Sequence, residues 1–245
     1  MTNVRIDFLG WDSNFFGLKI GKIDLSLTKN LNKLNKFKKS LEESDYDLIY
    51  IFSDISQMPF PYFNKTTLTL IDTQIHLKMN MPLNIKPLKY ELITKDNLPR
   101  KVKIDDLFKI SDGIAPFSRF SYDSKISKKK VIELYHKFIE NSLNGTFGKG
   151  LILDTEINGK LIGLFSIDSF DNIGKEIIIG IKKFYRGKGS GRRLFDKSLN
   201  YWKDRGVKEV KTIVSARNLD SLNFHLKLGF NIFKINNVYH LWLKD

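Results

Sequence analysis

The stretch YRGKGSGRR at residues 185–193 governs how the rest of the sequence is interpreted. It sets Gly187, Gly189 and Gly191 among cationic side chains, after the apolar run 177–181 and before apolar residues at helical spacing. This order predicts a strand, a glycine-rich turn and an amphipathic helix. A helix N-terminus gathers unpaired N–H groups and the positive end of the helix dipole, and glycines let that backbone close around an anion. The stretch therefore predicts a phosphate site, and the alternative is a glycine-softened turn before a solvated basic helix.

Positive charge is concentrated in the same region. Between Lys182 and Lys211 there are eleven Lys or Arg residues and three Asp or Glu residues. The net charge of the whole chain, +14, favours anionic partners such as nucleic acid, anionic lipid or phosphorylated small molecules. Because lysine is frequent throughout the chain, composition bias explains the total charge equally well. Only the clustering after Ile181 points to a ligand.

The glycine spacing separates this turn from two familiar phosphate loops. A Walker A loop needs Gly, four residues and Gly-Lys-Ser/Thr, and a dinucleotide-binding turn needs G-x-G-x-x-G, whereas this turn has G-x-G-x-G. Arg186, Gly189 and Gly191 instead match R/Q-x-x-G-x-G/A, so the turn resembles the pyrophosphate loop of the GNAT superfamily of acetyl-CoA-dependent acetyltransferases. The resemblance implies acetyl-CoA as co-substrate, no metal, and a preceding strand whose amides hold the pantetheine arm and the thioester carbonyl. The cofactor residues that it implies here are Ile179, Gly180, Ile181, Arg186, Gly187, Lys188, Gly189, Ser190 and Gly191.

A second match to the same superfamily is the sequence NLDSLNFHLKLGF at residues 218–230. It is similar to the closing pattern N-x-x-A-x-x-hydrophobic-Y-x-x-x-G-F, in which the Asn contacts the pantetheine arm and the Tyr protonates the departing thiolate. The resemblance implies Asn218 as a cofactor residue, and this chain has His225 in place of the Tyr. Two helical turns separate these positions, so we expect both side chains on one face. His225 is the predicted catalytic proton donor, because an imidazole N–H can donate as a phenol does.

A narrower resemblance extends over most of the chain. WDSNFFG at 11–17, SRF at 118–120, IENS at 139–142 and HLW at 240–242 are similar to the dTDP-fucosamine (dTDP-4-amino-4,6-dideoxygalactose) N-acetyltransferases of surface-polysaccharide synthesis. The resemblance implies direct acetyl transfer to the amine of a nucleotide-linked amino sugar. Early aromatics would then stack on the base or sugar and an arginine would bind the diphosphate, with core packing and solvation as the respective alternatives. The predicted acceptor residues are Trp11, Phe15, Phe16 and Arg119.

The predicted fold class is α/β (α+β): a GNAT fold with a central mixed, mostly antiparallel sheet flanked by helices, plus a small N-terminal α/β domain. Two prolines and no clear period at 81–87 place the domain boundary there, which gives domains 1–85, contributing to the acceptor site, and 86–245. Strands are predicted at 4–9, 48–52, 66–79, 89–94, 150–156, 160–168, 175–181 and 207–214, with two closing strands in 230–243. Helices are predicted at 30–44, 105–110, 127–145, after the glycine turn and at 218–228, whereas 10–21 is predicted as a turn and extended chain and 57–61 as a loop.

Composition excludes several classes of function. The chain has 245 residues, 42% of them hydrophobic, which suffices for a sizeable core. With no cysteine it cannot use disulfides, thiolate metal sites or a thiol nucleophile. No apolar run approaches the ~18 residues of a membrane span, and the N-terminus lacks a signal-peptide core, so we expect a cytoplasmic protein without membrane insertion. The expected partners are acetyl-CoA and a nucleotide-linked amino sugar, without nucleic acid, and a homodimer is left open.

Two questions stay open at the level of sequence. The general base is not identifiable, because a water relay competes with several side chains, namely Asp54, His76, Glu156, Asp168 and His240. The acceptor could instead be a protein, an aminoglycoside or another small amine. A basic nucleic-acid-binding module is the third interpretation, although the sequence contains neither a basic reading element nor an RNA-binding aromatic sheet.

Overall fold

The computed structural model of the chain describes residues 5–25, 41, 44–56 and 68–244. The predicted loop at 57–61 lies outside the described residues, and so does nearly all of the predicted helix at 30–44. Of that segment only Leu41 and Ser44 are described, and the Leu41 side chain is buried in a cluster with Ile49 and Tyr239.

The described strands form one nine-stranded sheet in the order β1-β2-β3-β9-β4-β8-β7-β6-β5. The pairs β2–β3 and β7–β8 are parallel and the other neighbours are antiparallel, so the predicted mixed, mostly antiparallel sheet is confirmed. The strands are β1 Asp7–Phe8, β2 Ile20–Asp24, β3 Leu48–Asp54, β4 Leu68–Asn80, β5 Gly150–Thr155, β6 Leu161–Phe170, β7 Ile173–Ile181, β8 Glu209–Ser215 and β9 Asn231–Trp242.

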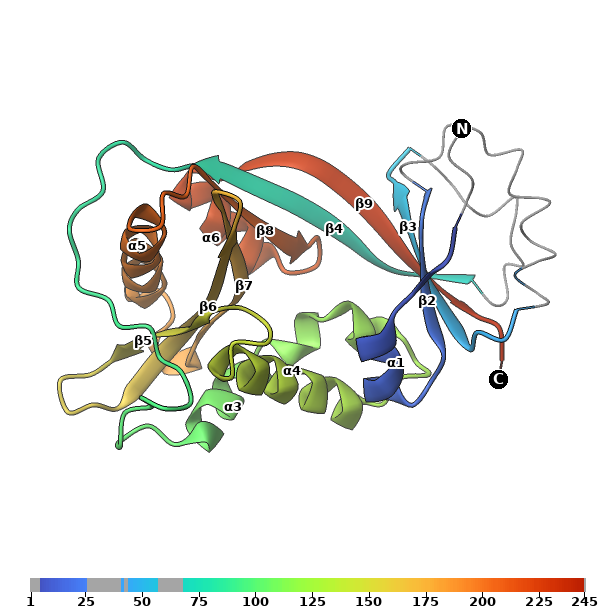
Figure 1. Ribbon diagram of the computed structural model, residues 1–245, viewed down its shortest axis with the longest axis horizontal. Helices are drawn as coiled ribbons and strands as arrows, with labels where there is room; N and C mark the ends of the chain where they lie inside the picture. The colour runs from blue at the N-terminus through green and yellow to red at the C-terminus, as the bar shows by residue number, and fades with distance from the viewer. Residues whose placement is uncertain (1–4, 26–40, 42–43, 57–67, 245) are drawn as a thin grey trace.

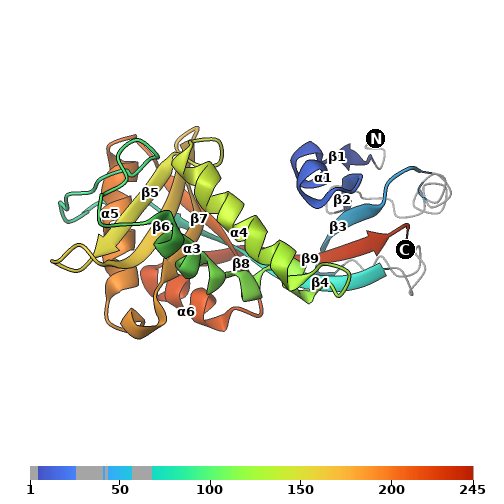
Figure 2. The same ribbon diagram turned by 90° about the horizontal axis from the view of Figure 1, so that it is seen from below.

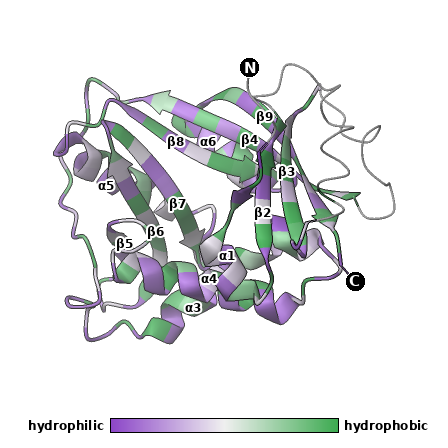
Figure 3. Cartoon of the chain, turned by 45° about the vertical axis from the view of Figure 1, so that its right-hand side comes forward, coloured by the Kyte–Doolittle hydropathy of each residue, from purple (hydrophilic) through white to green (hydrophobic). Residues whose placement is uncertain are grey.

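Helices cover both faces of this sheet. The α-helices are α1 Gly10–Phe16, α3 Ile104–Asp112, α4 Lys128–Leu143, α5 Ser190–Lys203 and α6 Leu219–Leu228, and the 3-10 turns are η3 Ala115–Phe117, η4 Arg119–Tyr122 and η5 Lys183–Tyr185. α5 and α6 pack in a core with Phe165 and Ile179, whereas α3 and α4 pack in a separate core with Leu164 and Ile178. Because neighbouring strand residues point to opposite faces, these two cores lie on opposite sides of the sheet. Figure 2 shows α3 and α4 in front of the strands of the sheet. Figure 3 shows the hydrophobic and hydrophilic residues of these two helices in alternating bands, as expected of amphipathic helices.

Two long strands join the N-terminal part of the chain to the rest. β4 and β9 curve across the molecule, with β5–β8 at one end and β1–β3 at the other (Figure 1). β4 precedes the predicted boundary near residue 85, yet it pairs with both β8 and β9 in the middle of the sheet. The predicted division at 85 therefore does not coincide with a break in the sheet, and the N-terminal strands extend the same sheet as the C-terminal ones.

The C-terminal segment differs from its predicted two strands, because β9 is one continuous strand from Asn231 to Trp242. Its central Asn236 and Asn237, which suggest a turn, both lie inside the ladder with β4. The Asn237 Oδ1 accepts a hydrogen bond of 2.9 Å from the hydroxyl of Thr73 on β4. Two register shifts in the β4–β9 ladder absorb the curvature that a separate turn would otherwise supply.

Residues 10–21 also differ from the predicted turn and extended chain, because residues 10–16 form the helix α1. Gly17 ends this helix in the left-handed conformation, with φ +70°. The Ser13 hydroxyl accepts a 3.0 Å hydrogen bond from the Ile20 N–H and thereby ties the helix to the start of β2. The predicted strand at 89–94 reduces to one bridge between Ile93 and Leu151.

The sheet opens between its central parallel strands. β7 and β8 pair only from Ile173 to Lys175 on β7, opposite Glu209 to Lys211 on β8. Beyond these pairs the two strands run in the same direction without a ladder. Against β6, the register of β7 shifts so that Ile177 is an extra, bulged residue. The separation and the bulge fall at the same level of β7, and they define where the site lies.

Candidate active site

A cleft of about 670 Å³ occupies the space where β7 and β8 separate. Its walls come from Glu176 to Ile181 of β7, from Thr212 to Ser215 of β8, from the glycine loop and from the start of α6. Ile114, Phe117 and Tyr135 add a wall from the α3–α4 side. Because α5 and α6 lie on the other face of the sheet, the cleft is accessible to groups from both faces. One ligand can therefore approach from the glycine loop while a second approaches from the α4 side.

The glycine loop forms the N-terminus of α5. Gly189 is its N-cap residue with φ +82°, and Gly187 has φ +73°, both in the left-handed region that favours glycine. The first hydrogen bond of the helix runs from the Arg193 N–H to the Gly189 carbonyl. The amides that precede it, at residues 190–192, are the ones that a helix leaves unpaired at its start. The loop therefore presents N–H donors and the positive helix end to the cleft, as an anion site requires.

The structure gathers most of the predicted cofactor residues in one place. Two of them do not line the cleft with their side chains. Lys188 places its Nζ 3.8 Å from the centre of the Phe184 ring, and Ser190 is buried with its hydroxyl accepting from Arg193. The predicted cofactor residues that line the cleft are Ile179, Gly180, Ile181, Arg186, Gly187, Gly189, Gly191 and Asn218.

Two of these residues have contacts that fix their orientation. The Arg186 Nε donates to the Ile181 carbonyl at 3.1 Å, which holds its guanidinium beside the loop. The Oδ1 of Asn218, the N-cap of α6, accepts from the Ser221 N–H at 3.1 Å. The amide nitrogen of Asn218 is therefore available to donate to a ligand in the cleft.

Gly180 serves packing rather than the bulge, which lies at Ile177. A Cβ at position 180 would come within 2.5 Å of Ile110 and 2.8 Å of Ile114, both from the α3 side. Any side chain there would require Ile110 and Ile114 to move. Gly180 therefore lets α3 approach β7 and form the wall of the cleft.

His225 occupies a different position from the one that the sequence predicts. Its side chain is fully buried, and its Nδ1 donates to the Ser221 carbonyl at 2.7 Å while its Nε2 lies 2.8 Å from the Oε1 of Glu176. Asn218, the N-cap of α6, lines the cleft, but His225 does not. The His225 ring instead contacts the Glu176 carboxylate on β7. Proton donation from His225 to a thiolate in the cleft would require the ring to leave Glu176. The described geometry instead makes His225 the residue that holds Glu176.

Glu176 is the functional candidate that sequence reasoning missed. It lines the cleft next to the bulged Ile177, where β7 and β8 begin to separate. Its Oε1 is bound by His225, and its Oε2 is buried and has no hydrogen-bond partner among the described residues. A buried carboxylate oxygen without a partner is rare in folded proteins and suggests a functional role. The sequence contains one signal that could have identified Glu176, because an acidic residue directly precedes the apolar run that leads into the glycine loop.

The protonation of His225 couples this pair to folding. Burial opposes a charge on the ring, but the Glu176 carboxylate and the Ser221 carbonyl outweigh burial and raise the pKa of His225 above 6.5. The folded protein therefore binds this proton more tightly than the unfolded chain does. The resulting stabilisation is fully present below the unfolded value and is lost as the pH rises through the folded value.

This coupling gives a prediction for His225→Gln, which keeps a donor toward Glu176 but cannot titrate. We expect the free energy of unfolding of the parent to fall more between about pH 6 and about pH 9 than that of the variant. Urea denaturation at both pH values measures the difference. Equal pH dependence in the two proteins would show that His225 has the same pKa in both states.

None of the five base candidates from the sequence lines the cleft. Asp54 accepts from Ser56, Glu156 accepts from the Tyr185 hydroxyl, and Asp168 accepts from the Ser169 N–H. His76 packs edge-on against the Phe233 ring. The remaining candidate, His240, is fully buried, and its Nδ1 lies 2.6 Å from the Oδ2 of Asp123. Burial lowers the pKa of His240.

The predicted acceptor residues lie apart from the cleft. Trp11 and Phe15 stack at 5.4 Å and line a second groove of about 580 Å³, together with Lys130 and His136 of α4. Phe16 is partly buried and packs against the core cluster that contains Tyr50 and Phe120. This arrangement brings the early aromatics to α4, the same helix that supplies Tyr135 to the cleft.

Arg119 does not line the cleft and packs against aromatic rings of β3 and η4. Its guanidinium carbon is 4.7 Å from the centre of the Tyr50 ring and 4.5 Å from that of Phe120. Its Nε is buried and has no partner among the described residues. Burial raises the pKa of Tyr135, and the Ser118 hydroxyl and the charge of Arg119 oppose that rise. Arg119 is therefore within electrostatic reach of a residue that lines the cleft.

A buried carboxyl group, that of Asp72 on β4, is bonded to the β8 end of the cleft. The Ser215 hydroxyl, which lines the cleft, donates to the Oδ1 of Asp72 at 2.6 Å. Burial raises the pKa of Asp72, opposed by the Ser215 hydrogen bond and by the charges of Arg217 and Arg119. The β8 end of the cleft is thus polar at Ser215, in contrast to the apolar Ile114 and Phe117 of the α3–α4 wall.

The described residues include no group of His, Asp or Glu side chains placed to hold a metal ion. Among the helices that the structure describes, none has the length and apolar character that crossing a bilayer requires.

Part of the chain is similar to known acetyltransferases. Residues 116–230 match the model of the acetyltransferase (GNAT) family. An uncharacterized N-acetyltransferase of Methanocaldococcus jannaschii is 29% identical over 154 residues, which cover 60% of this chain and 62% of that relative. The match thus spans less than two thirds of the relative's length.

Solved structures share the architecture at low identity. A GCN5-related N-acetyltransferase from Sphaerobacter thermophilus aligns over 98% of this chain and 76% of its own, with 10% identity and a TM-score of 0.57. A functionally unknown protein from Staphylococcus epidermidis aligns over 99% and 92%, with 11% identity and a TM-score of 0.62. These likenesses confirm the predicted fold.

Proposed function

We propose that this chain, whose residues 116–230 match the acetyltransferase (GNAT) family, is an acetyl-CoA-dependent N-acetyltransferase. The observation that carries the proposal is the junction of two features in one cleft. The glycine loop at the start of α5 offers an anion site, and β7 leads from that loop to the gap beside β8. A pyrophosphate at the loop would direct its pantetheine arm along β7 to Glu176.

The reaction requires a neutral amine and a stabilised leaving thiolate. The amine attacks the thioester carbonyl, the new C–N bond forms, and the C–S bond breaks as the thiolate leaves. Backbone amides freed from the β7–β8 ladder can donate to the oxygen on which negative charge develops. The amine proton must go to a base near the end of the pantetheine arm.

Glu176 is the base that this site offers. Its Oε1 is fixed by His225, so the unpaired Oε2 keeps a set orientation at the junction of β7 and β8. A carboxylate held by one oxygen and free at the other can accept a proton from an amine that enters between the strands. His225 acts through Glu176 in this assignment and is a positioning residue.

For the acceptor we propose a nucleotide-linked amino sugar of the 4-amino-4,6-dideoxyhexose type. The Ser215 hydroxyl at the end of β8, which is bonded to Asp72, and the Tyr135 side chain of α4 suit a hydroxyl-bearing acceptor. The groove of Trp11 and Phe15 supplies exposed aromatic surface for a base. A protein or aminoglycoside amine is the alternative, and nothing in the cleft favours it over a sugar.

Thermal shift tests the activity class and the acceptor together. Acetyl-CoA should raise the melting temperature if the cofactor assignment is correct, and TDP-linked amino sugars should raise it further. An oligonucleotide that stabilises the chain while acetyl-CoA does not would support nucleic-acid binding instead.

Replacement of Trp11 by alanine tests the acceptor assignment. Loss of one stacking ring, worth about 1–3 kcal/mol per base, should raise the KM for the nucleotide sugar about tenfold and leave that for acetyl-CoA unchanged. Steady-state kinetics with each substrate varied in turn measures both values.

The matched control for this prediction is Phe147→Ala. Phe147 stacks on Phe138 at 5.2 Å, as Trp11 does at 6.0 Å, but it does not line the groove. Phe147→Ala should therefore leave the KM values for the nucleotide sugar and for acetyl-CoA unchanged. A similar rise for both substrates in Trp11→Ala would instead indicate general loss of stability.

A further inference from the structure

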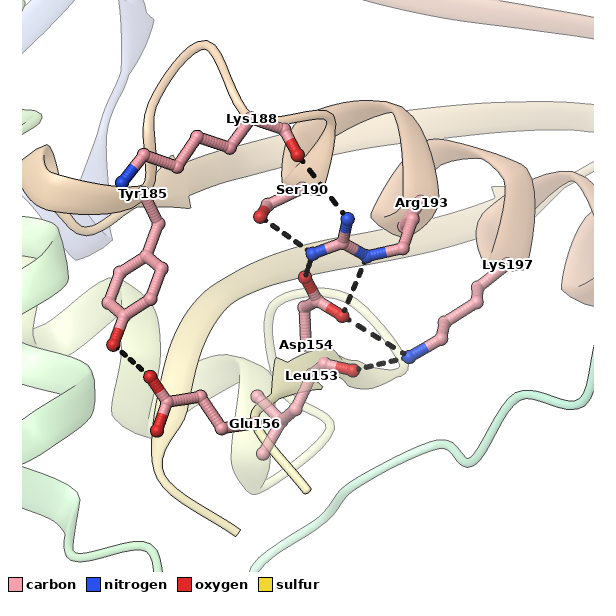
Figure 4. A network of polar contacts seen from close by, with 8 residues as sticks. All are labelled: Leu153, Asp154, Glu156, Tyr185, Lys188, Ser190, Arg193 and Lys197. Atoms are coloured by element: carbon pink, nitrogen blue, oxygen red, sulfur yellow. Dashed lines mark hydrogen bonds and ion pairs between the residues drawn. The ribbon is translucent and has the colours of Figure 1, made fainter. Parts of the chain in front are cut away.

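One cation of the glycine loop turns away from the cleft. Arg193 does not line it, whereas Arg186 and Arg192 do. The guanidinium of Arg193 points to β5, where its NH2 group donates to the Oδ2 of Asp154 at 2.8 Å and its Nε lies 3.5 Å from Oδ1 (Figure 4). Its position in the sequence suggests a phosphate ligand, but its contacts are with the protein.

The same guanidinium holds the loop on both sides of Gly189. It donates to the Ser190 hydroxyl at 2.8 Å, and its NH1 group lies 3.5 Å from the Lys188 carbonyl oxygen. Figure 4 shows these contacts converging on Arg193 from the loop above and from β5 below. Gly187 and Gly189 confer backbone freedom, so the loop needs an external contact to keep one conformation.

Asp154 is the fixed end of this contact. It is only 4% exposed, and its second cation, Lys197, lies 3.8 Å from Oδ1 while donating to the Leu153 carbonyl at 3.0 Å. A buried carboxylate needs its cationic partner, because an unpaired buried charge is strongly unfavourable. The pair therefore resists rotation of Arg193 toward a ligand.

We infer that Asp154 and Arg193 are a positioning pair that sets the shape of the pyrophosphate loop without touching the cofactor. This inference rests on the proposed function. By tying the residues on either side of Gly189 to β5, the pair holds the amides at the start of α5 in a convergent arrangement. The affinity for acetyl-CoA then depends on Asp154, whereas binding of the pantetheine arm along β7 does not.

The test compares acetyl-CoA with S-acetylpantetheine, which lacks the pyrophosphate, as acetyl donors for Asp154→Asn. The substitution keeps the shape of the side chain and removes its charge. We expect the KM for acetyl-CoA to rise about tenfold, as for loss of one charge-assisted hydrogen bond, with kcat unchanged. The KM for S-acetylpantetheine should stay within about twofold of the parent value.

The control is Asp204→Asn at the other end of α5, where the Asp204 carboxylate accepts from the Tyr90 hydroxyl at 2.8 Å. It also replaces one carboxylate by an amide, but at the C-cap of α5, away from the glycine loop, and should leave both KM values unchanged. If Asp154→Asn does not fold, Arg193→Met breaks the same ion pair by replacing its half-exposed partner. Its KM values for the two donors are measured in the same way.

Two results would overturn the inference. An equal rise of KM for both donors would show a general distortion, and an unchanged KM for acetyl-CoA would show that the loop keeps its shape without the pair. Failure of the proposed function is separate, because it would appear as no CoA binding by the parent chain in calorimetry.

Discussion

Replacement of Gly189 by glutamate is expected to abolish CoA binding while the chain stays folded. Gly189 lies at the N-cap of α5, where the unpaired amides face the cleft. A carboxylate there would compete for those amides and repel the pyrophosphate. Loss of two charge-assisted hydrogen bonds, each worth about 1.5–3 kcal/mol, corresponds to at least about a hundredfold loss of affinity. Calorimetric titration with CoA measures it.

Gly206→Glu is the matched control for this prediction. Gly206 also has positive φ, +68° against +82° at Gly189, and a Cβ there would meet nothing within 4 Å. The two variants thus carry similar backbone strain and the same added charge. Gly206 follows α5 at its far end, so its variant should bind CoA as the parent does. Equal affinity in folded Gly189→Glu and the parent would remove the loop from the CoA site.

Glu176→Gln is expected to lower kcat by about 10²–10⁴-fold with little change in the KM for acetyl-CoA, because general-base catalysis contributes about that factor. The amide can still accept from His225, so the packing under β7 is retained. Asp168→Asn, which changes a carboxylate outside the cleft, should keep the parent kcat. Retention of kcat in Glu176→Gln would leave a water relay as the route for the proton.

His225→Gln separates the two roles considered for the histidine. Glutamine can donate to Glu176 but cannot protonate a thiolate, so a positioning role predicts that kcat is largely retained. His225→Phe removes the donor, leaves both Glu176 oxygens without a partner and should lower kcat. If both variants lose activity equally, the imidazole itself is the proton donor, and it must leave Glu176 during turnover.

The glycine loop and its helix could be predicted from sequence because their determinants are local. Positive φ at Gly187 and Gly189 and the apolar spacing of α5 depend on neighbouring residues alone. The caps of α4 and α6 by Ser127 and Asn218 are local in the same way. Patterns of this kind identify the element and its ends without knowledge of its partners.

The errors have tertiary causes. β9 stays continuous through Asn236 and Asn237 because β3 and β4 pair with it from both sides. The role of His225 depends on Glu176, which is 49 residues away in the sequence. The buried end of the Arg193 contact is likewise 39 residues away. A helix pattern shows which residue replaces the family tyrosine, but only the packed sheet shows which atom it meets.

The most direct test of the proposed function is acceptor-dependent release of the CoA thiol from acetyl-CoA. The acceptor panel contains TDP- and UDP-linked amino sugars, an aminoglycoside and a lysine peptide, each with the parent chain and with Glu176→Gln. The proposed function predicts release by the parent with a nucleotide-linked amino sugar, and release reduced by about 10²-fold or more in Glu176→Gln. If acetyl-CoA binds but no acceptor stimulates release above the rate without acceptor, the proposed transfer reaction is contradicted.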